Sequence, residues 1–435
     1  MKSLGIIWAQ YGPYHMARVA AMKRLAGSLQ IHALELADQT LLYDWKRSSN
    51  VKPITLCPGS PVEKLSFQRV FHQTRRVLSE LEIDVCFLPS YAPSQSLAAF
   101  MAAKSLGLRT VLMNESHAGT SQASGAAAWV KRRLVRSFDA ALVGGKPQTR
   151  YLVALGLPQE KIFTGYDAVD NDYFAQRAGE IRERKAEFRC QYELPEDFFL
   201  SLGRFIPKKN LAMLIRAFHL FLHSNPDGQF HLVMVGSGEE FNRLTVLCQD
   251  LGLPIYDKSS AGVPNGQTKM PSPSQPGVHF YGFRQIKENP VFYALADAFV
   301  LPSLREEWGL VVNEAMASGL PVIVSETAGC CEDLLRPCSF SKEAMARTKE
   351  MAGLRLRQNG FAFDPNSTES LAQAFRTLAA EPELRETMGQ ASQGIVEAYS
   401  CASFASNAML AARTAVGEEI STAKLELTEA QELRS

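Results

Sequence analysis

The sequence lacks long apolar runs and an excess of either charge. No stretch of its 435 residues approaches 18 consecutive apolar positions, so we expect neither a signal peptide nor a membrane-spanning helix. The formal net charge is only +1, which argues against general binding of nucleic acid. What remains is a protein that acts on smaller or less charged partners.

Metal-binding patterns are missing as well. The eight cysteines include no Cys-x-x-Cys pair, and several lie in apolar segments, which indicates buried, reduced thiols in a cytoplasmic protein. There is no His-Glu-x-x-His pattern and no pair of aspartates after a predicted strand. We therefore predict no metal site.

The chain does have length and apolar content. Of its 435 residues, 46% are hydrophobic and 21% are charged, which is enough to bury two sizeable cores. Two domains are the natural expectation.

Two glutamates flank a predicted strand-to-helix turn. The short apolar run 298–301 predicts a buried strand, and residues 310–318 have helical spacing that ends at Gly319. Glu306 then lies on the loop at the carboxyl end of the strand, and Glu314 lies one to two turns into the helix. Open α/β sheets bind their ligands at this edge.

The turn between these glutamates favours a phosphorylated, hydroxyl-rich ligand. The amides of Gly309 and Leu310 lie at the helix N-terminus, where free N–H groups and the helix dipole attract phosphate. Glu306 would face the crevice, and Glu314 could accept hydrogen bonds from hydroxyls such as those of a ribose. The alternative is a pair of solvated glutamates beside an ordinary helix.

A basic loop follows a second predicted strand at 198–200 and precedes a helical pattern. Gly203 lets the backbone turn and approach a ligand, and Arg204 offers a planar fork of donors suited to phosphate oxygens. Lys209 adds a point charge five residues further on. The alternative is a solvated basic loop.

Taken together, these segments resemble the C-terminal half of the retaining, nucleotide-sugar-dependent glycosyltransferases of family 4 (glycosyl transferases group 1), which have the GT-B fold. Further segments match in the family's order along the chain. They are Leu232–Gly238, Tyr281–Arg284, Tyr293–Ala298, Ala328–Leu334 and Asn359–Phe361.

The resemblance implies an α/β fold of two Rossmann-like, doubly wound domains that face each other across a cleft. Residues 1–190 would bind the acceptor, and residues 195–389 would bind the nucleotide sugar. A last helix, about 390–414, would cross back to the first domain. The Pro/Ser/Gly-rich segment 255–277 is expected to be a flexible insertion, and 416–435 a frayed or disordered tail.

The resemblance also implies a role for each matching residue. Arg204 and Lys209 would bind the donor diphosphate and stabilise charge on the leaving group. Glu306 would face the donor sugar, and Glu314 would bind the ribose hydroxyls. The predicted donor-binding residues are Gly203, Arg204, Lys209, Trp308, Gly309, Leu310 and Glu314.

The N-terminal half departs from the family in its first loop. The family usually has adjacent glycines there, facing the donor phosphates or the acceptor, whereas this chain keeps only Gly12. His15 and Arg18 become candidates for acceptor or phosphate contacts. The alternative is that both are polar residues at a helix start.

A histidine follows the predicted strand at 110–113. His117 matches the family's histidine near the donor sugar and joins Arg204, Lys209 and Glu306 as a catalytic candidate; a surface histidine is the alternative. Glu115 is added on the acceptor side. At the expected hinge the family favours Asn-Gly, but this chain has Asp167-Ala168, and alanine resists a positive φ.

The implied reaction moves a sugar from a nucleotide-diphosphate sugar to a hydroxyl of a glycan, a lipid-linked sugar or a small metabolite, with retention of configuration. No side chain is an obvious covalent nucleophile, so our hypothesis is a front-face route in which the leaving phosphate accepts the acceptor proton. The family needs no divalent metal, and the nucleotide sugar is a co-substrate. The alternatives are another GT-B enzyme (an epimerase or a phosphorylase) or a catalytically silent homologue that acts as a binding subunit.

Residues 129–136 concentrate four basic side chains in a helical frame. A helical wheel places three arginines with Trp129 in one sector, and Val130 with the other apolar residues in the opposite one. Such a helix could lie on an anionic membrane surface, which would make a cytoplasmic protein peripheral to the membrane. The alternative is a solvated basic face over a core-facing stripe.

Overall fold

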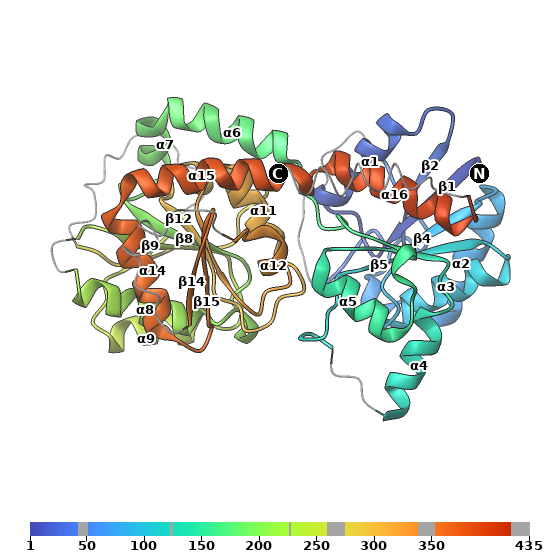
Figure 1. Cartoon of the computed structure of the whole chain (residues 1–435), viewed down its shortest axis with the longest axis horizontal. Helices are drawn as coiled ribbons and strands as arrows, with labels where there is room; N and C mark the ends of the chain where they lie inside the picture. Colours follow the sequence, from blue (N-terminus) through green and yellow to red (C-terminus); the bar gives the residue numbers. More distant parts are fainter. Residues whose placement is uncertain (42–50, 122–124, 226–227, 259–274, 338–352, 419–435) are drawn as a thin grey trace. The chain divides into compact units, whose positions relative to one another are not determined.

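The computed structural model describes residues 1–41, 51–121, 125–225, 228–258, 275–337 and 353–418. The chain divides into two compact units, shown in Figure 1. Unit 1 comprises Met1–Asp170 and the chain from Ala398 onward, and unit 2 comprises Asn171–Glu397.

Unit 1 contains a seven-stranded sheet in the order β3-β2-β1-β4-β5-β6-β7, in which every neighbouring pair is parallel. The strands are β1 (Ser3–Trp8), β2 (Gln30–Glu35), β3 (Ile54–Thr55), β4 (Val85–Pro89), β5 (Arg109–Asn114), β6 (Ala140–Val143) and β7 (Ile162–Phe163). The helices are α1 (Pro13–Leu25), α2 (Phe67–Glu80), α3 (Ser94–Ser105), α4 (Gly125–Val135), α5 (Lys146–Leu155) and α16 (Cys401–Ala415).

Both faces of this sheet are covered. All six residues of β1 are buried, as expected for a strand between two layers of helices. One core layer joins the sheet to α1 and α16, and the other joins it to α2, α3 and α5.

Unit 2 contains an eight-stranded sheet in the order β10-β11-β9-β8-β12-β13-β15-β14, in which only the β14–β15 pair is antiparallel. The strands are β8 (Phe198–Leu202), β9 (His231–Val235), β10 (Ile255–Asp257), β11 (Val278–Phe280), β12 (Ala298–Leu301), β13 (Val322–Ser325), β14 (Leu354–Arg357) and β15 (Gly360–Phe363). The helices are α6 (Asn171–Glu183), α7 (Lys185–Tyr192), α8 (Leu211–His223), α9 (Phe241–Asp250), α10 (Asn289–Leu295), α11 (Leu310–Ala317), α12 (Cys331–Leu334), α14 (Thr368–Ala380) and α15 (Pro382–Val396).

Helices cover both faces of the second sheet too. The phenylalanine-rich core beneath α8, α9 and α14 lies on one face. Helices α10 and α11 pack with α6 and α15 away from that core. Both units are thus Rossmann-like and doubly wound, as predicted.

The boundaries differ from those expected. Residues 171–190 belong to unit 2, because α6 and α7 pack on α10. The single helix expected at 390–414 is two helices, α15 in unit 2 and α16 in unit 1, with a break at residues 397–400.

Two further expectations concern parts of the chain that lie mostly outside the described residues, namely 259–274 of the insertion and 419–435 of the tail. Among the helices that are described, none combines the length and apolarity needed to cross a membrane.

Candidate active site

The candidate site lies where the strand order of the unit 2 sheet reverses. The strands that follow β8 in sequence, β9 to β11, lie on one side of it, and β12 lies on the other. The loops after two such strands diverge and leave a crevice at their carboxyl ends, the usual ligand site of open α/β sheets. The basic loop follows β8 and the glutamate loop follows β12, so the topology brings the two predicted motifs together.

An ion pair joins these loops. The ammonium group of Lys209 donates to Oε2 of Glu306, and the two side chains are only 13% and 10% exposed. The hydroxyl of Ser303 donates to the same oxygen at 2.9 Å. Glu306 is therefore held by two donors in a partly desolvated place, and these bonds fix its position before any ligand arrives.

Glycine allows the β8 loop to lie against a second turn. Gly236, which ends β9, has φ +143°, and a Cβ there would lie 1.8 Å from the carbonyl oxygen of Gly203. The Gly203 N–H donates to Val235 O at 2.9 Å, and the Phe205 N–H donates to Ser237 O at 2.8 Å. These bonds on either side fix the backbone of Arg204, whose side chain is half-buried.

Helix α11 begins at the predicted turn. Gly309 is its N-cap with φ +112°, and a Cβ there would lie 2.9 Å from Leu301 and 3.4 Å from Cγ of Glu306. Trp308 is buried and donates from Nε1 to Oδ1 of Asn313 at 2.9 Å. The tryptophan thus fixes the turn from inside, and the backbone at Gly309 and Leu310 is what could meet a ligand.

The second glutamate is buried within α11. Glu314 is 0% exposed and accepts a hydrogen bond from the Tyr293 hydroxyl on α10 at 2.8 Å. Its contact with a ribose stays a prediction, and it requires the ribose to reach an enclosed carboxylate. Sequence reasoning did not select Tyr293, Ser303 or Asn313, because an isolated Tyr, Ser or Asn carries no spacing signal.

The other predicted site residues lie in unit 1. Gly12 is the N-cap of α1, and its N–H donates to Nδ1 of His15 at 3.0 Å. The His15 ring stacks on Trp8 with centroids 4.5 Å apart. Burial, together with the charge of Arg18, lowers the pKa of His15 to about 3, so this ring is neutral at pH 7.

Arg18 is buried inside unit 1. It is 1% exposed, its Nε donates to Ala168 O at 2.9 Å, and its guanidinium lies 5.0 Å from the Tyr166 ring centroid and 5.8 Å from that of Phe404. In this structure it packs against the hinge segment, and its acceptor or phosphate contact stays a prediction. Ala168 has no positive φ, so the alanine causes no strain there.

His117 follows β5, as expected, and is 9% exposed. Its Nδ1 accepts a hydrogen bond from the Gly119 N–H at 3.2 Å, so the hydrogen of the neutral ring resides on Nε2, which can donate. Glu115 is half-buried. Burial raises the pKa of the Tyr166 hydroxyl, and the charge of Glu115 raises it further. The roles of both residues stay predictions.

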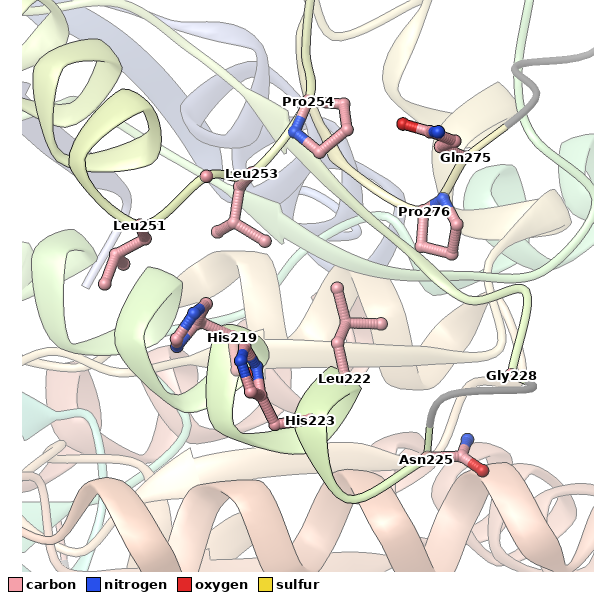
Figure 2. Close-up of a pocket in the computed structure, with 11 residues that line it drawn as sticks. His219, Leu222, His223, Asn225, Gly228, Leu251, Leu253, Pro254, Gln275 and Pro276 are labelled. Carbon is pink, nitrogen blue, oxygen red and sulfur yellow. The ribbon is translucent and has the colours of Figure 1, made fainter.

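A separate hollow of about 450 Å³ in unit 2 is shown in Figure 2. Leu222, Leu253 and Pro276 line it, with His219 and His223 of α8 beside them. It lies at the C-terminal ends of α8 and α9, which lead into the amino ends of β9 and β10, and so at the opposite edge of the sheet from the ion pair. Across the described residues, no group of three or more His, Cys, Asp or Glu could hold a metal ion.

The fold resembles that of known proteins. The chain resembles the solved structure of sucrose-phosphate synthase from Thermosynechococcus elongatus (TM-score 0.68, 17% identity, 96% of this chain and 100% of that one). It also resembles Anabaena HepE in complex with UDP-glucose (TM-score 0.63, 16% identity, 96% and 100%). At such identities the likeness concerns the fold, which is that of GT-B glycosyltransferases.

Residues 196–381 match the family model for glycosyl transferases group 1. A sulfoquinovosyl transferase of Arabidopsis thaliana is 35% identical over 120 residues, which cover 28% of this chain and 20% of the relative. A GDP-mannose-dependent phosphatidylinositol monomannoside mannosyltransferase of Mycolicibacterium smegmatis is 25% identical over 275 residues, 61% and 64% of the two chains. The chain thus spans less than two thirds of the length of these curated relatives.

Proposed function

We propose that this protein is a retaining glycosyltransferase that moves a sugar from a nucleotide-diphosphate sugar to a hydroxyl of an acceptor. The observation that carries the proposal is the ion pair of Lys209 and Glu306 at the reversal point of the unit 2 sheet. It supplies a cation for a diphosphate and a carboxylate for a sugar within one partly desolvated place.

Each charged group then has a defined task. The ammonium of Lys209 and the guanidinium of Arg204 bind the diphosphate and stabilise the charge that develops on it as the glycosidic bond breaks. The amides at the start of α11 add donors without adding a metal ion. Activity in the presence of excess EDTA is therefore expected to equal the activity without it.

Glu306 is a poor candidate for a covalent nucleophile. Oε2 already accepts from Lys209 and from Ser303, and both bonds stabilise the carboxylate and reduce its reactivity. This supports the front-face route, in which the leaving phosphate takes the acceptor proton. The expected product of an α-linked donor is an α-linkage, and NMR of the new bond that showed β would exclude the route.

The donor is expected to carry a ribose and a diphosphate. Glu314 would accept from the ribose, and Nε2–H of His117 would donate to a hydroxyl of the sugar. Among similar proteins, the names of some specify GDP-mannose and the solved structures of others contain UDP or UDP-glucose, so both bases belong in the screen.

A thermal-shift screen against UDP, GDP, ADP and their common sugar conjugates tests the proposal. We expect one nucleotide to raise the melting temperature of the wild type and to fail with an Arg204→Ala/Lys209→Ala variant, since a ligand that binds only the folded state stabilises it. No shift at millimolar ligand would favour the catalytically silent homologue. Turnover of a sugar nucleotide to its epimer without an acceptor would favour the epimerase.

A further inference from the structure

Helix α4 of unit 1 is exposed over most of its surface, and its inner face is narrow. Of its eleven residues only Val135 is buried. Trp129 is 65% exposed and Val130 is 56% exposed. Of the apolar sector that the helical wheel defines, Leu134, Val135 and Phe138 do pack on the core, whereas Val130 does not. The inner side of the helix is formed by Lys131, Leu134 and Val135. Figure 1 shows α4 at the margin of its unit, extending away from the sheet.

The surface around these apolar side chains is basic. Arg132, Arg133 and Arg136 are exposed on and just after α4, and Lys146 and Arg150 are exposed on α5, against which α4 packs. Asp139 is the only acidic residue in the sequence from 116 to 159. Its carboxylate is already paired with Lys104 and Arg109 at 2.8 and 3.0 Å.

One lysine fixes which side of α4 faces outward. The ammonium of Lys131 donates to Ser121 Oγ at 2.6 Å and to the Tyr151 hydroxyl on α5 at 2.9 Å, and it lies 5.5 Å from the ring centroids of Tyr91 and Tyr151. These contacts hold the inner side of the helix to its unit. Trp129, Val130 and Arg133 are left on the outer side.

We propose that the outer face of α4 docks unit 1 on an anionic membrane surface. An exposed tryptophan flanked by arginines matches the interface of a bilayer, where indole rings lie among the headgroups and each basic residue gains from anionic lipid. Burial of Trp129 and Val130 among the lipids removes their apolar surface from water, which folding alone does not do.

Docking on a membrane limits the range of acceptors that the proposed transferase would use. The loop that carries His117 leads to Ser121, which Lys131 binds, so the docking helix is fastened to the carboxyl edge of the unit 1 sheet. An acceptor hydroxyl carried by a membrane lipid would be delivered to this edge. This part rests on the proposed function, whereas the docking itself does not.

Intrinsic fluorescence of the full chain tests the docking. Trp8 and Trp308 are buried, at 3% and 1% exposure, so they contribute little change. Trp45 lies outside the described residues and is replaced by Phe in every protein compared, so that the further change Trp129→Phe isolates the signal of Trp129. With vesicles of phosphatidylcholine and phosphatidylglycerol we expect a blue shift that Trp129→Phe loses, that weakens at high salt and that is far smaller with phosphatidylcholine alone.

Charge reversal gives the second measurement. Arg132→Glu/Arg133→Glu is expected to weaken vesicle binding at least about tenfold. The matched control, Arg75→Glu/Arg76→Glu on the exposed side of α2, changes the net charge equally and is expected to bind as the wild type does. Equal binding by the two variants, or binding to dextran sulfate but not to vesicles, would overturn the proposal.

The nucleotide screen separates this test from that of the proposed function. Arg132→Glu/Arg133→Glu should keep the full thermal shift with the donor nucleotide, because α4 belongs to unit 1 and the ion pair to unit 2. If the wild type binds vesicles but no nucleotide raises its melting temperature, the docking proposal is supported and the proposed transferase function is contradicted. If a nucleotide raises the melting temperature but the wild type does not bind vesicles, the transferase proposal is supported and the docking proposal is contradicted.

Discussion

The two units share one kind of sheet but differ in what they place at its point of reversal. In unit 2 the loops after β8 and β12 meet through Lys209 and Glu306, two charged side chains joined in a crevice. In unit 1 the first turn of α1, which follows β1, carries a neutral histidine stacked on Trp8, and Arg18 of the same helix is buried. The scaffold therefore does not determine the chemistry; the loop residues do.

The difference fits two kinds of ligand. A nucleotide diphosphate is strongly charged and needs fixed countercharges, which unit 2 supplies. The neutral aromatic and imidazole groups of unit 1 suit a sugar or another hydroxylated acceptor, which binds through ring faces and hydrogen bonds. Each of the following changes tests one side of this comparison.

Removal of the Lys209 ammonium group from unit 2 should have the largest effect, and the effect should be on activity. Lys209→Ala deletes the charge for the diphosphate and frees Glu306, so we expect kcat to fall about 10²- to 10³-fold in an assay of sugar transfer. The control is Lys208→Ala, which breaks the more exposed pair of Lys208 with Glu307 at 2.7 Å and should change kcat less than about threefold. Equal losses in both variants would mean that general positive charge, and not this pair, matters.

The next largest effect is expected from a substitution that strains the backbone. Gly236→Ala puts a Cβ against the Gly203 carbonyl at a positive φ, so we expect a loss of about 3 kcal/mol or more in the free energy of unfolding, measured with urea. Gly179→Ala is the matched control in the exposed interior of α6, with open space around the new Cβ, and should stabilise by about 0.5–1 kcal/mol. A stable Gly236→Ala protein would show that the β8 loop is not held as described.

The buried arginine of unit 1 should matter for stability alone. Arg18→Ala removes the bond to Ala168 and the contacts with two aromatic rings, and it leaves a cavity, so we expect a loss of about 2–3 kcal/mol in the free energy of unfolding. The nucleotide-induced thermal shift should not change. If the variant keeps its stability but loses the nucleotide-induced thermal shift, Arg18 contacts the ligand, and the two units do not differ in the way described.

The smallest effect expected is a pH dependence in unit 2. Burial raises the pKa of Asp297 to about 6, although Arg385 lies 3.3 Å away. Because this value exceeds the ordinary 3.8, the folded chain keeps a proton that the unfolded chain has lost. The stability that this proton gives is complete below about pH 4 and is lost as the pH rises through 6.

Asp297→Asn removes that dependence. We expect the stability of the variant relative to the wild type to increase between pH 4 and pH 7 by on the order of 1–3 kcal/mol, measured by urea unfolding at each pH. The direction of this slope is the test, whatever the offset between the two proteins. A slope of the opposite sign would mean that Arg385 lowers the pKa of Asp297 more than burial raises it.

The sequence could predict features that follow from local spacing. An apolar run that ends in a Gly or Pro loop and opens a helix implies a strand-turn-helix unit, and two such units gave the approximate places of Arg204, Lys209, Glu306 and Glu314. The two sheets were expected from the resemblance of these segments, in their order along the chain, to a known family. The Gly turn at 236–238 was visible in the same way. These features depend on the chain's own geometry over about twenty residues, so the residues themselves suffice.

Only the tertiary structure decided which of those residues meet. It joined Lys209 to Glu306 across 97 positions of sequence, added Ser303 as a partner of Glu306 and Tyr293 as a partner of Glu314, and placed Arg18 inside unit 1. It also ended one predicted helix and began another at residues 397–400, and it left Val130 exposed. Such outcomes depend on which surfaces the whole fold buries, and burial is a property of distant segments packed together, which no local pattern contains.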